Sequence, residues 1–180
     1  FIKSLKENIK EELNKDYEKL SQEIVLTTSE ILKNIKGVYI NKYERRIFIV
    51  QLEGKRIGFV FTGSFCTFRK TIEELKKIVK EKAKVIPIMS EHSYTMDTKF
   101  GNAIDFINEI EDITNEKILH TIQDVEPLGP KDMLDILVVA PASGNTMAKL
   151  ANDIIDGTAT MAVKSHLRRE RPVVIGISTN

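Results

Sequence analysis

The chain has 180 residues and a formal net charge of +1 at pH 7, and 42% of its residues are hydrophobic. This length suits one domain of ordinary size with an appendage, and the apolar content is sufficient for a buried core. The balanced charge argues against nucleic acid as the main partner, and the longest apolar runs are far below the length of a membrane span. Cys66 is the only cysteine and no signal-peptide pattern is visible, so we expect a cytoplasmic protein without internal disulfides.

Residues 1–52 are predicted to form a helical arm with short strands. Apolar residues recur at spacings of three, four or seven and so share one stripe of a helix that extends to about residue 36. These residues are Ile2, Leu5, Ile9, Leu13, Tyr17, Leu20 and Ile24. Short strands are expected at 38–40 and 46–50. Because the apolar stripe needs a partner surface, we interpret the arm as a docking or oligomerisation element.

From residue 53 to residue 180 the pattern changes to alternating strands and helices, which predicts a separate domain. The expected strands are 56–62, 84–89, 134–140 and 173–177, and the expected helices are 68–79, 103–113, one that opens after Ser143, and 161–167. Apolar runs bounded by turns are typical of buried parallel strands, and helices between them form right-handed crossovers. We therefore predict an α/β fold with a three-layer Rossmann- or flavodoxin-like parallel sheet.

Small polar residues follow three of the expected strands. They are Thr62-Gly63-Ser64 after the first strand, Ser90 after the second, and Ser143 to Thr146 after the third. Ligands of open α/β sheets bind just beyond the carboxyl ends of the strands, and N–H groups at helix starts favour anions. These turns predict a phosphate- or flavin-binding edge, although ordinary strand-to-helix turns have the same composition.

Asn145 stands out in the third turn because its amide offers both a donor and an acceptor. At a ligand-binding edge such an amide can bind a carboxylate or the edge of a flavin ring. Asn is also a good helix cap, as is Ser143, so both roles remain open. The sequence contains no cluster with metal-ligand spacing and no G-x-G-x-x-G nicotinamide fingerprint.

The segment Pro141-Ala142-Ser143-Gly144-Asn145-Thr146 resembles the Pro-Ala-Ser-Ala-Asn-Thr signature of the flavoprotein family of flavin-containing decarboxylases, with Gly144 where many members have Ala. The likeness is closer to one branch of that family, the dipicolinate synthase B subunits. The other segments similar to that branch are 54–59, 62–67, 97–101, 126–131 and 171–180. Each motif is short, but their order and spacing are specific, and the resemblance covers about residues 53 to 180.

The resemblance implies that FMN lies across the turns that follow the strands. The residues implied to bind it are Gly63, Ser64, Phe65, Ser90, Ala142, Ser143, Gly144, Asn145 and Thr146. The resemblance also implies a catalytic role for Asn145 in handling the substrate. Lys99 and Lys131 stand in family-like segments, and their positive charge suits a small substrate with two carboxylates.

The same resemblance implies the B subunit of dipicolinate synthase, which oxidises dihydrodipicolinate to dipicolinate during bacterial sporulation. Its partner would be the A subunit of dipicolinate synthase, which would hold NADP, in agreement with the missing nicotinamide fingerprint here. The family further implies a homo-oligomer, a trimer or a multiple of one, in the cytoplasm of the mother cell. It also implies a complete domain that continues beyond residue 180. Two alternatives remain open: an FMN-dependent decarboxylase of the phosphopantothenoylcysteine type, and a non-catalytic structural subunit of the same fold.

Overall fold

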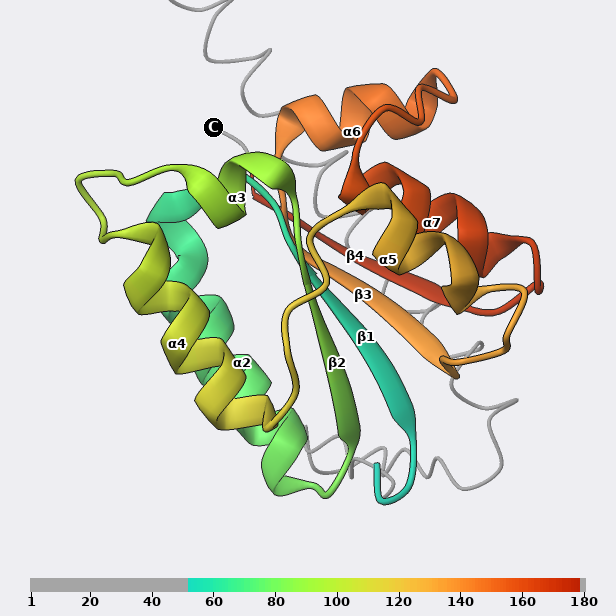
Figure 1. Cartoon of the computed structure of the whole chain (residues 1–180), viewed down its shortest axis with the longest axis horizontal. Coiled ribbons are helices and arrows are strands. Elements are labelled where there is room, and N and C mark those ends of the chain that lie inside the picture. The colour runs from blue at the N-terminus through green and yellow to red at the C-terminus, as the bar shows by residue number, and fades with distance from the viewer. Residues whose placement is uncertain (1–51, 179–180) are drawn as a thin grey trace, which may run out of the picture. The chain divides into compact units, whose positions relative to one another are not determined.

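Four parallel strands form the central sheet of the computed structural model, in the spatial order β2-β1-β3-β4 (Figure 1). The strands are β1 (Arg56–Phe61), β2 (Lys84–Met89), β3 (Ile136–Ala142) and β4 (Val173–Ile177). The structure describes residues 52–178, so the predicted arm, apart from Leu52, lies outside the described residues. The chain runs from β1 outward to β2 and then returns to β3 on the other side of β1.

Helices cover both faces of the sheet. On one face lie α2 (Phe68–Lys80) and α4 (Ala103–Thr114), and on the other lie α5 (Ile122–Val125) and α7 (Thr158–Leu167) (Figure 1). Beyond the carboxyl ends of the strands lie α3 (Glu91–Thr95) and α6 (Gly144–Ala151), and short 3-10 helices cover Phe65–Thr67 and Glu126–Leu128. This arrangement confirms the predicted α/β fold class with a parallel flavodoxin-like sheet.

Strand β1 separates two apolar cores, because its side chains point alternately to the two faces of the sheet. Phe59 belongs to the core beneath α2 and α4, whereas Val60 belongs to the core beneath α5 and α7. At Gly58 an added Cβ atom would lie 2.6 Å from δ-carbons of both Leu134 and Leu137. The missing side chain of Gly58 therefore lets these two leucines pack directly on the strand.

The predicted bounds of β2 and β4 are confirmed, whereas β3 and α7 depart from the prediction. β3 begins at Ile136 and not at Leu134. Leu134 is buried, but it belongs to the loop that precedes the strand, so its apolar side chain extended the predicted strand too far. α7 begins at Thr158 instead of 161, because the Oγ1 atom of Thr160 accepts the N–H of Gly157 at 3.3 Å and caps the first turn. The short helices had no counterpart in the prediction, since so few residues carry no periodic signal. Among residues 52–178, no helix is both long and apolar enough to cross a lipid bilayer.

Candidate functional site

The carboxyl edge of the sheet contains the topological switch point of the fold. The crossovers from β1 and β3 leave in opposite directions, to β2 and to β4, while β1 and β3 lie next to each other. In open parallel sheets, ligands bind outside the carboxyl ends of the two strands at such a point. The turns after these strands hold most of the residues that the sequence predicts for the site.

Thr62 ties the turn after β1 to the turn after β3. The residue is 1% exposed, and its hydroxyl donates to the carbonyl of Pro141 at 2.7 Å and accepts the N–H of Ser143 at 2.9 Å. The backbone N–H of Thr62 also donates to the Pro141 carbonyl, at 3.2 Å. Direct hydrogen bonds from one buried residue therefore set the relative position of the two turns.

The first turn of α6 lies at this edge. Ser143 caps the helix, because its hydroxyl accepts the N–H of Thr146 at 3.3 Å, while its own N–H is bound by Thr62. Gly144 and Asn145 occupy the first two helical positions, where backbone N–H groups have no acceptor within the helix. Both residues are exposed. Two backbone donors at the positive end of the helix dipole are thus available to an anion or a carbonyl oxygen.

This geometry separates the two roles left open for Asn145. The cap is Ser143, whereas Asn145 lies two positions further along, at the second helical position, and is exposed. Within residues 52–178 its amide makes no side-chain hydrogen bond to the cap. The capping role therefore falls to Ser143, and a ligand-binding role for Asn145 stays a prediction.

A second group of hydroxyls joins the end of β1 to the end of β4. Ser64 Oγ donates to the carbonyl of Ser178 at 2.7 Å, and Thr67 Oγ1 lies 3.1 Å from Ser178 Oγ. The N–H of Ser178 in turn donates to the carbonyl of Ala142 at 2.9 Å. Because the hydroxyl hydrogen of Ser64 is used by Ser178, Ser64 Oγ can accept a hydrogen bond from a ligand but not donate one.

Ser90 extends the edge to the other side of β1. Its N–H donates to the carbonyl of Phe61 at 2.9 Å, and its hydroxyl caps α3 by accepting the N–H of Ser93 at 3.4 Å. The ends of all four strands are therefore connected by hydrogen bonds across the carboxyl edge.

Phe65 and Ala142 differ in how much of the side chain reaches the edge. The Phe65 ring packs on Phe68 with a centroid distance of 5.1 Å, and Ala142 is fully buried in the core beneath α7. Core packing therefore accounts for the side chain of Ala142, while the Phe65 ring is only partly buried. A contact of Ala142 with a cofactor is restricted to main-chain atoms, whereas the predicted contact of Phe65 stays a prediction for its ring and its backbone.

The structure places the two predicted lysines on different sides of the sheet's ends. Lys99 lies in the loop between α3 and α4, where its Nζ atom is 5.2 Å from the centre of the Phe100 ring. Lys131 precedes β3, so it lies at the opposite end of this strand from Ser143. Within one copy of the chain, the expected contact of Lys131 with a substrate at the carboxyl edge is not supported.

At the edge, Thr67 and Ser178 were absent from the predicted set, whereas Thr62 was part of a predicted turn without a role of its own. Each is a hydroxyl residue directly after a strand or in the following turn, and this is the signal that could have found them. The turns at 62–67 and 142–146 contain hydroxyls, an amide, the single thiol of Cys66 and backbone donors but no carboxylate, imidazole or amine. They can therefore bind and orient a ligand, while redox chemistry needs a bound group. No cluster of three His, Cys, Asp or Glu side chains within the described part of the chain is placed to hold a metal.

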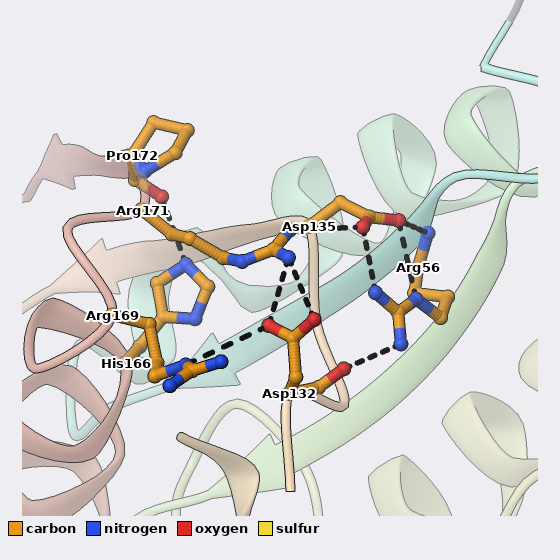
Figure 2. A network of polar contacts seen from close by, with 7 residues as sticks. All are labelled: Arg56, Asp132, Asp135, His166, Arg169, Arg171 and Pro172. Atoms are coloured by element: carbon orange, nitrogen blue, oxygen red, sulfur yellow. Dashed lines mark hydrogen bonds and ion pairs between the residues drawn. The ribbon is translucent and has the colours of Figure 1, made fainter. Parts of the chain in front are cut away.

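A network of charged residues lies at the opposite, amino-terminal edge of the sheet (Figure 2). Arg56 at the start of β1 contacts the Asp135 carboxylate at 2.8 Å. Arg171, just before β4, lies 3.0 Å from Asp135 and 2.8 Å from Asp132, and Arg169 adds a contact of 4.0 Å to Asp132. Because each carboxylate is matched by guanidinium groups of the same chain, we interpret the network as a brace between strand starts rather than a ligand site.

The pKa values of two side chains in this network, Asp135 and His166, are shifted. Hydrogen bonding from Arg56, together with its charge, lowers the pKa of Asp135 from 3.8 to about 2. His166 is 1% exposed, and burial lowers the pKa of its ring. In its neutral form the ring donates from Nε2 to the carbonyl of Pro172 at 3.2 Å (Figure 2). Both shifts follow from structural contacts, so neither marks a catalytic group here.

Comparison with known families finds a match: a sequence model of the family described as Flavoprotein matches residues 48–180. The chain belongs to the flavoprotein family. The matched range includes every turn at the carboxyl edge. The B subunit of dipicolinate synthase from Bacillus subtilis (strain 168) is 44% identical to this flavoprotein over 129 residues, which are 72% of the chain and 64% of the relative. The chain thus spans somewhat less than two thirds of that relative's length.

Solved flavoprotein structures agree with this assignment. The B subunit of dipicolinate synthase from Bacillus halodurans superposes with a TM-score of 0.64 at 42% identity, over 72% of this chain and 67% of the other. The FMN-dependent cysteine decarboxylase TvaF from thioviridamide biosynthesis gives a TM-score of 0.52 at 22% identity, over 71% and 75% of the two chains. The second likeness supports the fold alone. The first, with the relative from Bacillus subtilis, makes this flavoprotein a homologue of the dipicolinate synthase B subunits.

Proposed function

We propose that this flavoprotein is the B subunit of a dipicolinate synthase and that it binds FMN at the carboxyl edge of its sheet. The observation that carries the proposal is the joined row of turns at the switch point, with the helix-start donors of Gly144 and Asn145 exposed. Its support comes from a relative at 44% identity that is a dipicolinate synthase B subunit. The fold neighbour TvaF, described as FMN-dependent, is consistent with the cofactor.

The groups at the edge fit FMN through hydrogen bonds rather than through charged side chains. The N–H groups of Gly144 and Asn145 suit phosphate or carbonyl oxygens of FMN. Ser64 Oγ retains acceptor capacity, which suits the ribityl hydroxyls. The Asn145 amide suits either the ring edge or a substrate carboxylate. When bound, the flavin would supply redox chemistry, which the residues of these turns cannot provide.

The finer parts of the proposal concern substrate and partner. The substrate is dihydrodipicolinate, which loses a hydride and a proton to become dipicolinate, and NADP on the partner A subunit receives the hydride. Lys99 remains a candidate for a substrate carboxylate because it is exposed in the loop after α3. A homo-oligomer, a trimer or a multiple of one, in the cytoplasm of a sporulating cell belongs to the same proposal.

Gly144→Pro tests the cofactor site because it removes a single backbone N–H group, that of residue 144. Proline is tolerated at the first helical position, and the preceding Ser143 already has φ −73° and ψ 155°, which proline permits. The variant loses one N–H donor to a charged ligand, so we expect FMN to bind about tenfold more weakly or worse. Binding is measured by titrating the purified full-length protein and following the flavin bands at roughly 375 and 450 nm.

The matched control is Gly144→Ala, which keeps the N–H group and is expected to bind FMN as the wild type does. Asn145→Ala is expected to weaken FMN binding, whereas Asn108→Ala, an exposed asparagine on α4, is not. Equal FMN affinity in Gly144→Pro and Gly144→Ala would move the cofactor away from α6. No flavin binding by the folded wild type would remove the cofactor from the proposal and favour a purely structural role.

A further inference from the structure

The hydrogen bonds of the Thr62 hydroxyl have only one possible direction. The Pro141 carbonyl can only accept, and the Ser143 N–H can only donate, so the hydroxyl must donate to the first and accept from the second. Thr62 is 1% exposed, and residues of both turns surround this hydroxyl. Its hydroxyl group thus has two fixed partners on the neighbouring strand end.

We infer that Thr62 is a positioning residue of the proposed flavin site, whose buried hydroxyl holds the first turn of α6 in register with the Gly63–Ser64 turn. The inference rests on the proposed FMN site. It assigns a role to a residue that would not touch the cofactor itself, because Thr62 is buried and acts through the residues on either side of it.

Two connections carry this role. On one side, Thr62 is followed directly by Gly63 and Ser64, which form the turn after β1. On the other, it holds the backbone N–H of Ser143, which is the cap of α6 and immediately precedes the exposed donors of that helix. A hydroxyl lost at position 62 leaves the part-buried Ser143 N–H without its acceptor, so we expect the cap to move toward another one.

Thr62→Val tests the role, because valine keeps the shape and β-branching of threonine but has no hydroxyl. We expect Thr62→Val to bind FMN at least tenfold more weakly than the wild type and to shift the visible bands of the bound flavin. Thr62→Ser retains the hydroxyl, and we expect it to bind within about threefold of the wild type. Flavin titrations of the full-length proteins, with the unfolding temperature of each apoprotein recorded in parallel, give both quantities.

Thr114→Val is the matched control, because Thr114 Oγ1 also donates to a backbone carbonyl, that of Ile110 at 2.8 Å, at the end of α4. We expect it to lower the unfolding temperature without changing FMN affinity or the flavin spectrum. FMN binding by Thr62→Val with wild-type affinity and spectrum would overturn the inference, whatever the unfolding temperature. If Thr62→Val does not fold, Thr62→Cys, with only a weak S–H donor, takes its place, and wild-type affinity in that variant overturns it equally. Absence of FMN binding by the wild type overturns the proposed cofactor site, and this inference with it.

Discussion

Single glycines decide how closely elements of this protein approach each other, and Gly129 is the tightest case. Its N–H donates to Ser165 Oγ at 2.9 Å, and the same hydroxyl donates to the carbonyl of Glu126 at 2.6 Å. A Cβ atom at position 129 would lie 1.9 Å from the backbone oxygen of Ser165. The φ angle of Gly129 is −72°, which any residue adopts, so the constraint is space alone. This contact fixes the segment before β3 on α7.

Gly129→Ala is therefore expected to lower the free energy of unfolding by about 3 kcal/mol, because backbone rather than a flexible side chain must move. Urea denaturation of the purified protein measures this loss. Gly63→Ala is the control, since an added Cβ atom there meets nothing within 4 Å. We expect its free energy of unfolding to stay within about 0.5 kcal/mol of the wild type. If Gly129→Ala also changed the free energy of unfolding by no more than about 0.5 kcal/mol, α7 would have to be free to move away from the added Cβ atom.

At the scale of elements, the two edges of the sheet are held by different chemistry. The carboxyl edge is joined by neutral hydrogen bonds of hydroxyls and backbone groups. The amino edge is joined by guanidinium and carboxylate groups that precede or begin β1, β3 and β4. The first arrangement leaves donors for a ligand, whereas the second satisfies its charges internally. This difference is the physical reason for placing the candidate site at the carboxyl edge.

Asp135→Asn tests the brace at the amino edge. The folded-state pKa of Asp135 is about 2, below its usual 3.8, so the ion pair stabilises the fold fully above about pH 4 and this stability is lost as the pH falls from about 4 to about 2. Since the side chain is 27% exposed, we expect the substitution to cost about 1–2 kcal/mol of unfolding free energy at pH 7. Urea unfolding at pH 7 and at pH 3 measures the effect, which should shrink at the lower pH.

Asp156→Asn serves as the control for this prediction. Asp156 pairs with Lys149 at 2.9 Å, but its side chain is 53% exposed, and exposed pairs contribute little to stability. We expect its urea midpoint to match that of the wild type at both pH values. A pH-independent loss in Asp135→Asn would assign the effect to packing instead of to charge.

At the scale of the whole molecule, the proposed reaction is divided between two kinds of polypeptide. This chain offers a flavoprotein fold with a polar carboxyl edge, and its sequence contains no dinucleotide fingerprint. Hydride transfer requires donor and acceptor to be held in near-contact geometry. The proposal therefore assigns the nicotinamide to another chain, and the relatives' description as B subunits is consistent with such a partner.

The full-length protein alone is accordingly expected to form no NADPH from dihydrodipicolinate and NADP. Addition of an A-type partner should restore turnover, followed by NADPH and dipicolinate absorbance. Asn145→Ala in the reconstituted enzyme should lower the rate by about tenfold to a thousandfold, as is common when one positioned polar contact is lost. Full turnover by this chain without a partner would contradict the two-chain proposal, and carbon dioxide release from a cysteine-derived carboxylate would favour the decarboxylase alternative.

Local patterns in the sequence determined the types and order of the strands and of the longer helices between residues 53 and 178. The bounds of β2 and β4 followed from apolar runs, and the small residues after the strands marked the edge that contains the switch point. This succeeds because periodicity and turn chemistry are properties of neighbouring residues. The family motifs around Ser143 pointed to the same edge.

Only the tertiary structure decided which groups meet. Thr62 bonds to residues 79 and 81 positions away, and Ser64 bonds to Ser178, 114 positions away, contacts that depend on the order of strands in the sheet. Lys131 was assigned to the site by its family-like segment alone, although its place before β3 puts it at the opposite end of that strand from Ser143. The capping role of Ser143 also required backbone coordinates, because Ser143 and Asn145 are both capable caps and only the start of the helix distinguishes them.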